Sequence, residues 1–304
     1  MLWQGRFDGE DPLYHRIFQR VSLETDYASI SPNDFVLHGF AVDEGVRRNK
    51  GRVGAKDAPD MIRKNTANFP VVNPEFVLKD FGNISCDDGD LEKSQKELAA
   101  KVSEVLKRKG KSIVFGGGHE VTFAHYSGIK NAFPDQKIGI INIDAHFDNR
   151  EPEESVGPSS GTGFWQIAQE GEINSLHIGI QKNSNTLKLF DTAHQYGMKY
   201  LLADELFFEN LPSIYATIDE TIRQCDILYL TICMDVFNAS IAPGVSAAAY
   251  NGIFSDAAFM HYFRHILKSE KLRALDIAEV NPGLDLENRT AKLAASLINE
   301  WLML

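Results

Sequence analysis

Three residues able to bind a metal ion stand at alternate positions in one short segment. Asp144, His146 and Asp148 follow the isoleucine-rich run IGIINI of residues 138–143. If the backbone stays extended, all three side chains leave from one face of the chain. Two carboxylates and an imidazole suit Mn, Fe(II), Zn or Ni better than Ca or Cu(I). The alternative is a strand that ends in an Asp-rich turn, with a hydrogen-bonded histidine beside it.

Three other segments with the composition of buried strands also end in residues that bind metals or protons. They are Ser112–Phe115, which three glycines join to His119 and Glu120; Ile227–Ile232, which is followed by Cys233, Met234 and Asp235; and Ala274–Ala278, which is followed by Glu279. In parallel sheets, ligands bind beyond the carboxyl ends of the strands, where these side chains would gather. We therefore predict a mononuclear or binuclear metal site at this edge.

Strands and helices are expected to alternate along the chain with short links. Strands are expected at 34–40, 76–80, 112–115, 138–143, 176–180, 199–202, 227–232 and 274–278. Helices are expected at 13–21, 58–64, 90–109, 187–197, 211–224 and 290–304, with another directly after Glu120. Because the strands lack a polar face, the pattern is typical of a parallel sheet covered by helices on both sides. We predict one α/β domain over residues 1–304, in three α/β/α layers with a mainly parallel sheet, and residues 1–33 as a peripheral segment.

Composition and charge exclude several classes of protein. The 304 residues are 43% hydrophobic, enough to bury a sizeable core, and no apolar run is long enough to cross a membrane. A net charge of −11 argues against a nucleic-acid partner and gives no support to binding an anionic membrane. The N-terminus lacks the order of a signal peptide, and the three cysteines do not make a paired framework. We expect a cytoplasmic protein that acts on a small molecule.

A basic stretch, Gly45–Arg52 (GVRRNKGR), precedes the helix expected at 58–64. The two interpretations are a phosphate-binding segment and a solvated loop. The solvated loop is favoured, because no glycine-rich phosphate motif accompanies the basic residues. The polar segment Glu151–Gly163 is a second loop, and loops placed after a catalytic strand often close over a substrate.

Taken together, the motifs at the strand ends resemble the ureohydrolase superfamily of arginases and agmatinases. That superfamily has a Gly-Gly-Asp-His-like turn, an Asp-Ala-His-x-Asp strand end and a later Asp-x-Asp segment. The corresponding stretches here are Gly116–Glu120, Asp144–Asp148 and Cys233–Asp235, followed by Ala242–Pro243–Gly244. More narrowly, the formimidoylglutamase branch is similar at Trp3–Glu10 (WQGRFDGE), Asp43–Arg52 (DEGVRRNKGR) and Ser159–Phe164 (SSGTGF). The likeness to the superfamily runs from about residue 34 to the C-terminus.

The resemblance implies a reaction, a cofactor and roles for the candidate residues. The branch hydrolyses N-formimidoyl-L-glutamate to L-glutamate and formamide, a late step of histidine breakdown, usually with two Mn ions. The nucleophile would be a metal-bound hydroxide. One metal would be held by His119, Asp144, Asp148 and position 233, and the other by Asp144, His146, Asp235 and position 233. Glu279 lies where the superfamily keeps a carboxylate facing the cationic group of the substrate. A homo-oligomer is expected.

Two departures from the superfamily pattern affect the expected chemistry. Many arginases and agmatinases have a histidine in the loop that is Ser159–Phe164 here, and its absence leaves Asp148 or solvent to carry the proton. The first Asp of Asp-x-Asp, which bridges both metals, is Cys233 in this chain. A single soft sulfur matches Mn poorly and Zn or Fe better. Either the thiolate coordinates and the site favours a softer metal, or the thiol stays neutral and the second metal binds weakly, which is the outcome we favour.

The two carboxylates of formimidoylglutamate need donors that bind anions. Arg150 lies two residues past Asp148, where arginases commonly have Asn, and its guanidinium is a candidate clamp for one carboxylate. A solvent-facing arginine is the alternative for this position. Ser160 is a further candidate donor to the substrate.

Two other functions remain open from the sequence. One is a ureohydrolase that acts on agmatine, arginine or another guanidino compound, for which Arg150 would be a hindrance. The other is a non-catalytic homologue that keeps the fold while Cys233 weakens its metal site.

Overall fold

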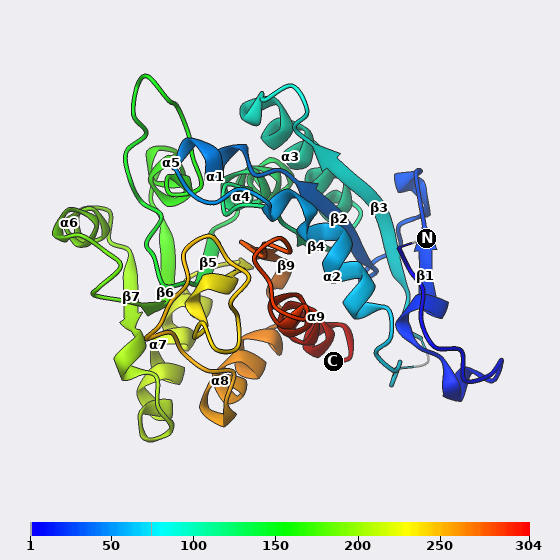
Figure 1. The fold of residues 1–304 in the computed structure, drawn as a ribbon. Coiled ribbons are helices and arrows are strands. Elements are labelled where there is room, and N and C mark those ends of the chain that lie inside the picture. Colours follow the sequence, from blue (N-terminus) through cyan, green and yellow to red (C-terminus); the bar gives the residue numbers. More distant parts are fainter. Residues whose placement is uncertain (1, 74) are drawn as a thin grey trace.

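The computed structural model describes residues 2–73 and 75–304, and this part of the chain contains one sheet of nine strands (Figure 1). The strands are β1 (Val21–Leu23), β2 (Phe35–Ala41), β3 (Leu78–Ser85), β4 (Lys111–Phe115), β5 (Ile138–Ile143), β6 (Asn174–Ile180), β7 (Lys199–Leu202), β8 (Ile227–Cys233) and β9 (Leu272–Ala278). Their order across the sheet is β1-β3-β2-β4-β9-β8-β5-β6-β7, and neighbouring strands run parallel. The predicted parallel sheet is therefore confirmed.

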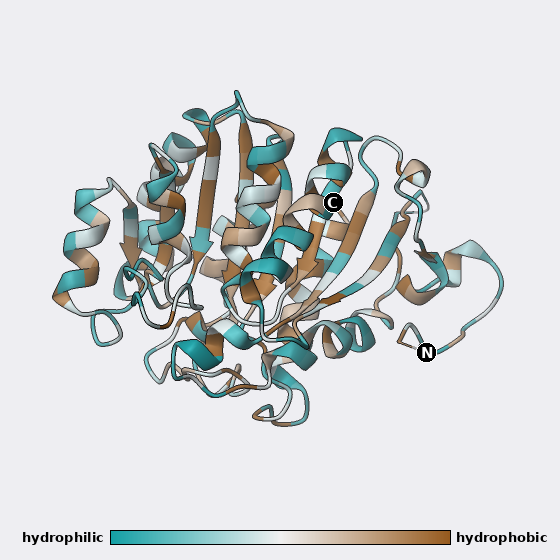
Figure 2. Cartoon of the chain, turned by 90° about the horizontal axis from the view of Figure 1, so that it is seen from above, coloured by the Kyte–Doolittle hydropathy of each residue, from teal (hydrophilic) through white to brown (hydrophobic). Residues whose placement is uncertain are grey.

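Helices cover both faces of this sheet, which confirms the predicted three layers (Figure 1). They are α1 (Glu44–Arg48), α2 (Ala58–Thr66), α3 (Leu91–Lys107), α4 (Val121–Ala132), α5 (Gly163–Gln169), α6 (Leu187–Gln195), α7 (Leu211–Arg223), α8 (Ala257–Leu267) and α9 (Arg289–Leu302). Helices α2, α7, α8 and α9 share one hydrophobic cluster with the sheet, and α3, α4, α5 and α6 share another. Figure 2 shows hydrophobic residues concentrated along the strands between the helices. Within the described residues, every helix is too short or too polar to span a lipid bilayer.

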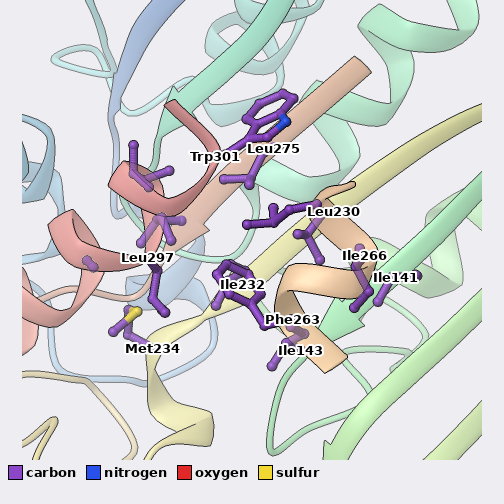
Figure 3. Close-up of a cluster of buried hydrophobic side chains, with 14 of the residues drawn as sticks. Ile141, Ile143, Leu230, Ile232, Met234, Phe263, Ile266, Leu275, Leu297 and Trp301 are labelled. Atoms are coloured by element: carbon purple, nitrogen blue, oxygen red, sulfur yellow. The ribbon is translucent and has the colours of Figure 1, made fainter. Parts of the chain in front are cut away.

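The face covered by α2, α7, α8 and α9 is apolar, and we call it the apolar face. Alternate residues of the central strands point to it, because successive side chains of a strand leave on opposite sides. Ile141, Ile143, Leu230, Ile232 and Leu275 meet side chains of α8 and α9 here (Figure 3). The helix side chains in this contact are Phe263, Ile266, Leu297 and Trp301.

The face covered by α3, α4, α5 and α6 contains buried polar side chains among its hydrophobic ones, and we call it the polar face. Asn142, His177, Tyr229, Thr231 and Asp276 lie on the strand positions between the apolar-face residues, and all of them are buried. The expectation that the strands lack a polar face is therefore wrong for this side of the sheet. The strands looked uniformly apolar because these polar residues occur singly between isoleucines and leucines.

Several expected elements differ from the structure. Residues 13–21 do not form an α-helix: two 3-10 turns, Pro12–Tyr14 and Ile17–Arg20, lead into β1. Leu13 and Tyr14 are exposed while Ile17 is buried, so the apolar residues of this segment do not form one continuous buried helix face. The strand expected at 76–80 is β3, which begins at Leu78 and continues to Ser85. Part of the segment 1–33 belongs to the sheet, since β1 pairs with β3 at its edge.

Three helices were not predicted. Helix α1 occupies much of the basic stretch that was expected to be a loop. Helix α5 begins at Gly163, the last residue of the expected polar loop after β5. No element was assigned to the region of α8, although its sequence carries a clear signal. Asp256 caps this helix by accepting a hydrogen bond from the Phe259 N–H, and its buried apolar residues recur with helical spacing.

Candidate metal centre

The candidate residues gather because four strands are consecutive neighbours in the sheet, in the order β4-β9-β8-β5. All four strands are parallel, so their carboxyl ends meet at one edge. His119 follows β4 after three glycines, Asp144 follows β5 directly, and Glu279 follows β9 directly. Cys233 is the last residue of β8, and Asp235 lies in the turn beyond it. The structure thus brings together residues from four separate segments.

Two clusters of possible ligand atoms share Asp144. In the first, the ligand atoms of His119, Asp144 and Cys233 lie within 4.8 Å of one another. His119 Nδ1 is 3.0 Å from Asp144 Oδ2 and 2.8 Å from Asp148 Oδ2. In the second, Asp144, His146 and Asp235 have ligand atoms within 4.8 Å of one another. His146 Nδ1 is 3.2 Å from Asp235 Oδ2 and 3.5 Å from Asp144 Oδ1.

The backbone of the site is not extended as the alternating pattern suggested. The chain bends after Asp144, whose Oδ1 accepts a hydrogen bond from the His146 N–H. Asp148 and Glu279 have left-handed backbones, with φ values of 46° and 66°. Residues other than glycine rarely adopt this conformation outside turns and functional sites. The side chains still converge, so the predicted grouping holds although its predicted geometry does not.

Close packing at the site requires glycine in the turn after β4. A Cβ atom added to Gly117 would collide with the carbonyl oxygen of Val42. The Gly117 carbonyl also accepts a hydrogen bond from the N–H of Glu279. A Cβ atom on Gly116 would likewise lie 2.6 Å from the carbonyl oxygen of Ile277 in β9. The glycines therefore allow the ends of β2 and β9 to approach the turn that carries His119.

The electrostatics of the site favour a bound cation. Burial lowers the pKa of His119, but hydrogen bonds to Asp144 and Asp148 outweigh it and raise that pKa well above its usual value. Burial likewise lowers the pKa of His146, while the charge of Asp235 and a hydrogen bond to Asp144 raise it to well above normal. Burial and then the charge of Asp235 raise the pKa of the Glu279 carboxyl. The site thus contains more carboxylates than positively charged side chains, and a bound cation would offset the excess negative charge.

The donor set fits a divalent metal, more completely in one cluster than in the other. Asp235 Oδ1 is buried and has no hydrogen-bond partner among the described residues, as expected for an oxygen that awaits a cation. The cluster of Asp144, His146 and Asp235 offers the oxygen and imidazole ligands that suit Mn²⁺. The other cluster includes Cys233, where burial and then the charge of Asp144 raise the thiol pKa well above normal. A protonated thiol is a poor metal ligand, so this cluster fits Mn²⁺ less well.

A cavity of about 310 Å³ opens onto the metal residues from the solvent side. Its less exposed lining residues are acidic and form what we call the floor: Asp235 and Glu279 are buried, and Asp148 is 17% exposed, beside His146. Its exposed lining residues Lys50, Arg52 and Arg150 are basic and form what we call the rim. Asn49, Ser160 and Ser246 are among the other lining residues. The predicted substrate residues Arg150 and Ser160 therefore both line the cavity.

The basic residues of the rim lack nearby acidic partners. Arg52 donates to the backbone carbonyls of Val245 and Ser246 at 2.9 Å each, and Arg150 donates to Asn49 Oδ1 at 3.2 Å. Among the described residues, neither these two arginines nor Lys50 forms a salt bridge, in contrast to the neighbouring Arg47 and Arg48, which pair with Glu44 and Glu92. The rim charges are therefore available to an anionic ligand.

The contribution of the basic stretch Gly45–Arg52 to the cavity was not predicted. A solvated loop was favoured there, whereas Asn49, Lys50 and Arg52 form one wall of the cavity. The signal was present in the density of basic residues, but only the tertiary structure places them opposite Arg150. Ser160 is buried and accepts a hydrogen bond from Asn49 Nδ2 at 3.2 Å, which joins the loop after β5 to this wall.

Comparison with known proteins identifies the family of this chain. The model of the Arginase family matches residues 33–304. The chain belongs to the arginase family. Among its relatives are formimidoylglutamases from two Staphylococcus aureus strains, bovine RF122 / ET3-1 and MRSA252. Each is 40% identical over 307 residues, covering 99% of this chain and 97% of the relative.

Solved structures of arginase-family proteins share the fold. Formimidoylglutamase from Bacillus subtilis superposes with a TM-score of 0.87 at 21% identity, covering 98% of this chain and 93% of that one. Formiminoglutamase from Trypanosoma cruzi, crystallised with Mn²⁺, superposes with a TM-score of 0.80 at 25% identity. That match covers 89% of this chain and 93% of the other. The arginase-family fold is thus shared over nearly the whole chain.

Proposed function

We propose that this arginase-family chain hydrolyses N-formimidoyl-L-glutamate to L-glutamate and formamide. The observation that carries the proposal is the charge arrangement of the cavity, with an acidic floor and a basic rim. The formimino head of the substrate is cationic when protonated, and its tail bears two carboxylates. A molecule of this kind matches both ends of the cavity, because opposite charges are paired at each end. The curated formimidoylglutamases at 40% identity support the same reaction.

Glu279 is the proposed partner of the cationic head. It lies on the cavity floor, and its Oε1 accepts a hydrogen bond from the His119 N–H at 3.0 Å. This bond fixes the carboxylate at the edge of the metal cluster. The formimino cation would stabilise the ionised form of Glu279 and receive charge-assisted hydrogen bonds in return. The formimino carbon would then be held toward the metal residues.

Asp148 is the proposed proton carrier. Its side chain is 17% exposed, and it lines the cavity while contacting His119. When the bond between the formimino carbon and the glutamate nitrogen breaks, that nitrogen needs a proton to leave as an amine. A carboxyl group at the junction of cavity and metal cluster can supply it. No histidine lies in the loop Ser159–Phe164 to take this role.

We propose Mn²⁺ as the cofactor, held by His119, Asp144, His146, Asp148 and Asp235, with Cys233 beside the first cluster. The Mn²⁺ in the Trypanosoma cruzi relative supports this choice. A bound divalent metal lowers the pKa of water and so supplies a nucleophile at neutral pH. Full occupancy is expected for the cluster of Asp144, His146 and Asp235, and partial occupancy for the cluster that contains Cys233.

The wider setting of the reaction follows from the same resemblance. We place it in histidine degradation and in the cytoplasm, with a homo-oligomeric assembly. The three cysteines are free, which agrees with a reducing compartment. The rim charges are expected to bind the substrate carboxylates, with Arg150 as a principal donor and Ser160 as a weaker one.

The experiment that tests this function compares substrates on Mn-loaded protein. Release of formamide and glutamate from formimidoylglutamate should far exceed release of urea from agmatine or arginine. Agmatine has a cationic tail and no carboxylate, so the basic rim should repel it. Preferred turnover of agmatine or arginine would support a guanidino hydrolase instead. Bound metal with no turnover of any of these compounds would support a non-catalytic homologue.

A further inference from the structure

A chain of hydrogen bonds runs from His119 into the polar face of the sheet. His119 Nε2 lies 3.0 Å from Thr231 Oγ1, and Thr231 Oγ1 donates to Asp276 Oδ1 at 2.6 Å. The three residues come from the turn after β4, from β8 and from β9, and all are buried. His119 thus contacts the metal cluster through Nδ1 and this chain through Nε2.

Asp276 is held by two further donors. Its Oδ2 accepts hydrogen bonds from the Tyr229 hydroxyl at 2.5 Å and from His125 Nδ1 at 2.7 Å. His125 Nε2 in turn lies 3.0 Å from Ser112 Oγ. All of these groups are buried, so no solvent is at hand to replace a missing partner. A buried carboxylate with three donors is satisfied as an anion, which makes it a strong and fixed acceptor.

The direction of each hydrogen bond follows from counting protons. An ionised Asp276 can only accept, so the single hydroxyl proton of Thr231 is directed to it. Thr231 Oγ1 must then accept from His119, which requires a proton of the imidazole to be on Nε2. His119 Nδ1 is then the nitrogen that faces Asp144 and Asp148; it donates a proton to these carboxylates in the metal-free site, and a bound metal would take the place of that proton.

We propose that Asp276, acting through Thr231, is the positioning group that holds His119 ready to bind metal through Nδ1. Partners of this kind fix both the tautomer and the orientation of a ligating imidazole. The inference concerns metal binding by the arginase-family site. It holds whichever amidine or guanidine the enzyme hydrolyses, and its test is independent of the substrate.

Two variants separate positioning from general stability. Thr231→Val and Tyr229→Phe each remove one hydroxyl donor to Asp276 from a buried position on β8. Only Thr231→Val breaks the chain to His119. The dissociation constant of Mn²⁺ for metal-stripped protein should rise ~10- to 100-fold in Thr231→Val. It should stay close to the wild-type value in Tyr229→Phe, while both variants lower the melting temperature of the metal-free protein.

Two further variants keep the proposal testable if Thr231→Val fails to fold. Thr231→Ser retains the hydroxyl and should bind Mn²⁺ as the wild type does. Asp276→Asn should weaken Mn²⁺ binding, because its amide oxygen stays with Tyr229 and His125 while its NH₂ group turns to Thr231. The Thr231 hydroxyl would then donate to His119 Nε2, so the single remaining imidazole proton would stay on Nδ1, where it competes with the metal. Wild-type affinity in Asp276→Asn, or equal losses in Thr231→Val and Tyr229→Phe, would overturn the proposal.

Discussion

The two faces of the sheet are both buried, yet they are built differently. On the apolar face, hydrocarbon side chains of the strands such as Ile143 and Ile232 meet hydrocarbon and aromatic side chains of α8 and α9 such as Phe263 (Figure 3). The polar face holds Thr231 and Asp276 at the neighbouring strand positions. A hydrocarbon contact contributes stability without directional bonds, whereas a buried polar group costs free energy unless every hydrogen bond is made.

This difference follows the period of two along each strand. Asn142 at the end of β5 and Asp144 just beyond it point to the same side, as do Thr231 and Cys233 on β8, since the members of each pair are two positions apart. The metal cluster therefore extends from the polar face of the sheet. Residues on this face can orient metal ligands directly, while residues on the apolar face act only by holding the sheet in place. The following predictions test that division.

The largest effect is expected from the cluster of Asp144, His146 and Asp235, and above all from Asp144, which both clusters share. Asp144→Ala, and likewise His146→Ala, should abolish metal loading and lower activity by more than ~10³-fold. The fold should be retained, because both residues lie beyond the end of β5 and losing Asp144 relieves repulsion among the acids around it. Metal analysis, activity and circular dichroism of the purified variants measure these effects. Near-normal hydrolysis by either variant would exclude the metal assignment.

The next largest effect is expected on the apolar face, and it should concern stability alone. Phe263 is fully buried between α8 and the sheet. Phe263→Ala should lower the free energy of unfolding by ~3–5 kcal/mol, since the lost contacts leave a cavity behind. The Mn²⁺ affinity of the folded variant should not change. A tenfold loss of affinity in Phe263→Ala would contradict the division between the two faces.

A residue outside both faces should affect the substrate and neither metal nor fold. Arg150 lies on the rim, and its proposed contact is with a carboxylate remote from the metal. Arg150→Ala should raise KM for formimidoylglutamate about 10- to 100-fold, the equivalent of ~1.5–3 kcal/mol for one charge-assisted hydrogen bond. Steady-state kinetics with parallel metal analysis measure both quantities. An unchanged KM would mean that Arg150 faces the solvent only.

The polar face should also make stability depend on pH through His38. This residue of β2 is fully buried, and burial is the main cause that lowers its pKa from 6.5 to about 3. Between these values the unfolded chain binds a proton that the folded chain does not, so stability is lost as the pH falls below 6.5. One such histidine contributes ~1.4 kcal/mol per pH unit in this range.

His38→Gln is the matched variant, because glutamine does not titrate and can still bond to the Tyr27 hydroxyl. The change in unfolding free energy between pH 7 and pH 5 should be smaller in this variant than in the wild type. Urea unfolding of the metal-free proteins at both pH values measures the difference. Identical pH dependence would show that His38 binds its proton equally well in the folded and the unfolded chain.

The smallest expected effect concerns the metal content at Cys233. A carboxylate can bridge two metals with its two oxygens, whereas a buried neutral thiol offers one soft atom. Cys233→Asp should therefore raise the Mn content toward about two per chain and lower the Mn²⁺ concentration needed for full activity. If the native protein already retains two Mn tightly and the variant changes neither quantity, position 233 is not the weak point of the site.

The sequence alone determined the central elements of the fold and the residues at their ends. Buried parallel strands have a local signature, a short apolar run between helices, so β4, β5, β8 and β9 were found together with His119, Asp144, Asp235 and Glu279. Helix α1 was not predicted, because its short charged sequence is typical of a loop. Resemblance to the arginase family came from these same short motifs, because each motif lies within a few consecutive residues.

The tertiary structure alone decided which distant segments meet. The order β4-β9-β8-β5 lets Thr231 link His119 to Asp276, 157 positions later in the chain. With β2 next to β4, the segment Asn49–Arg52 that follows β2 and α1 meets Arg150 beyond β5. Strand order depends on how all helices and strands pack at once, which no local pattern encodes. For the same reason, single polar residues inside apolar strands gave no sign that they share one face. The role of these polar residues depends on hydrogen-bond partners from other segments, which only the folded chain brings within reach.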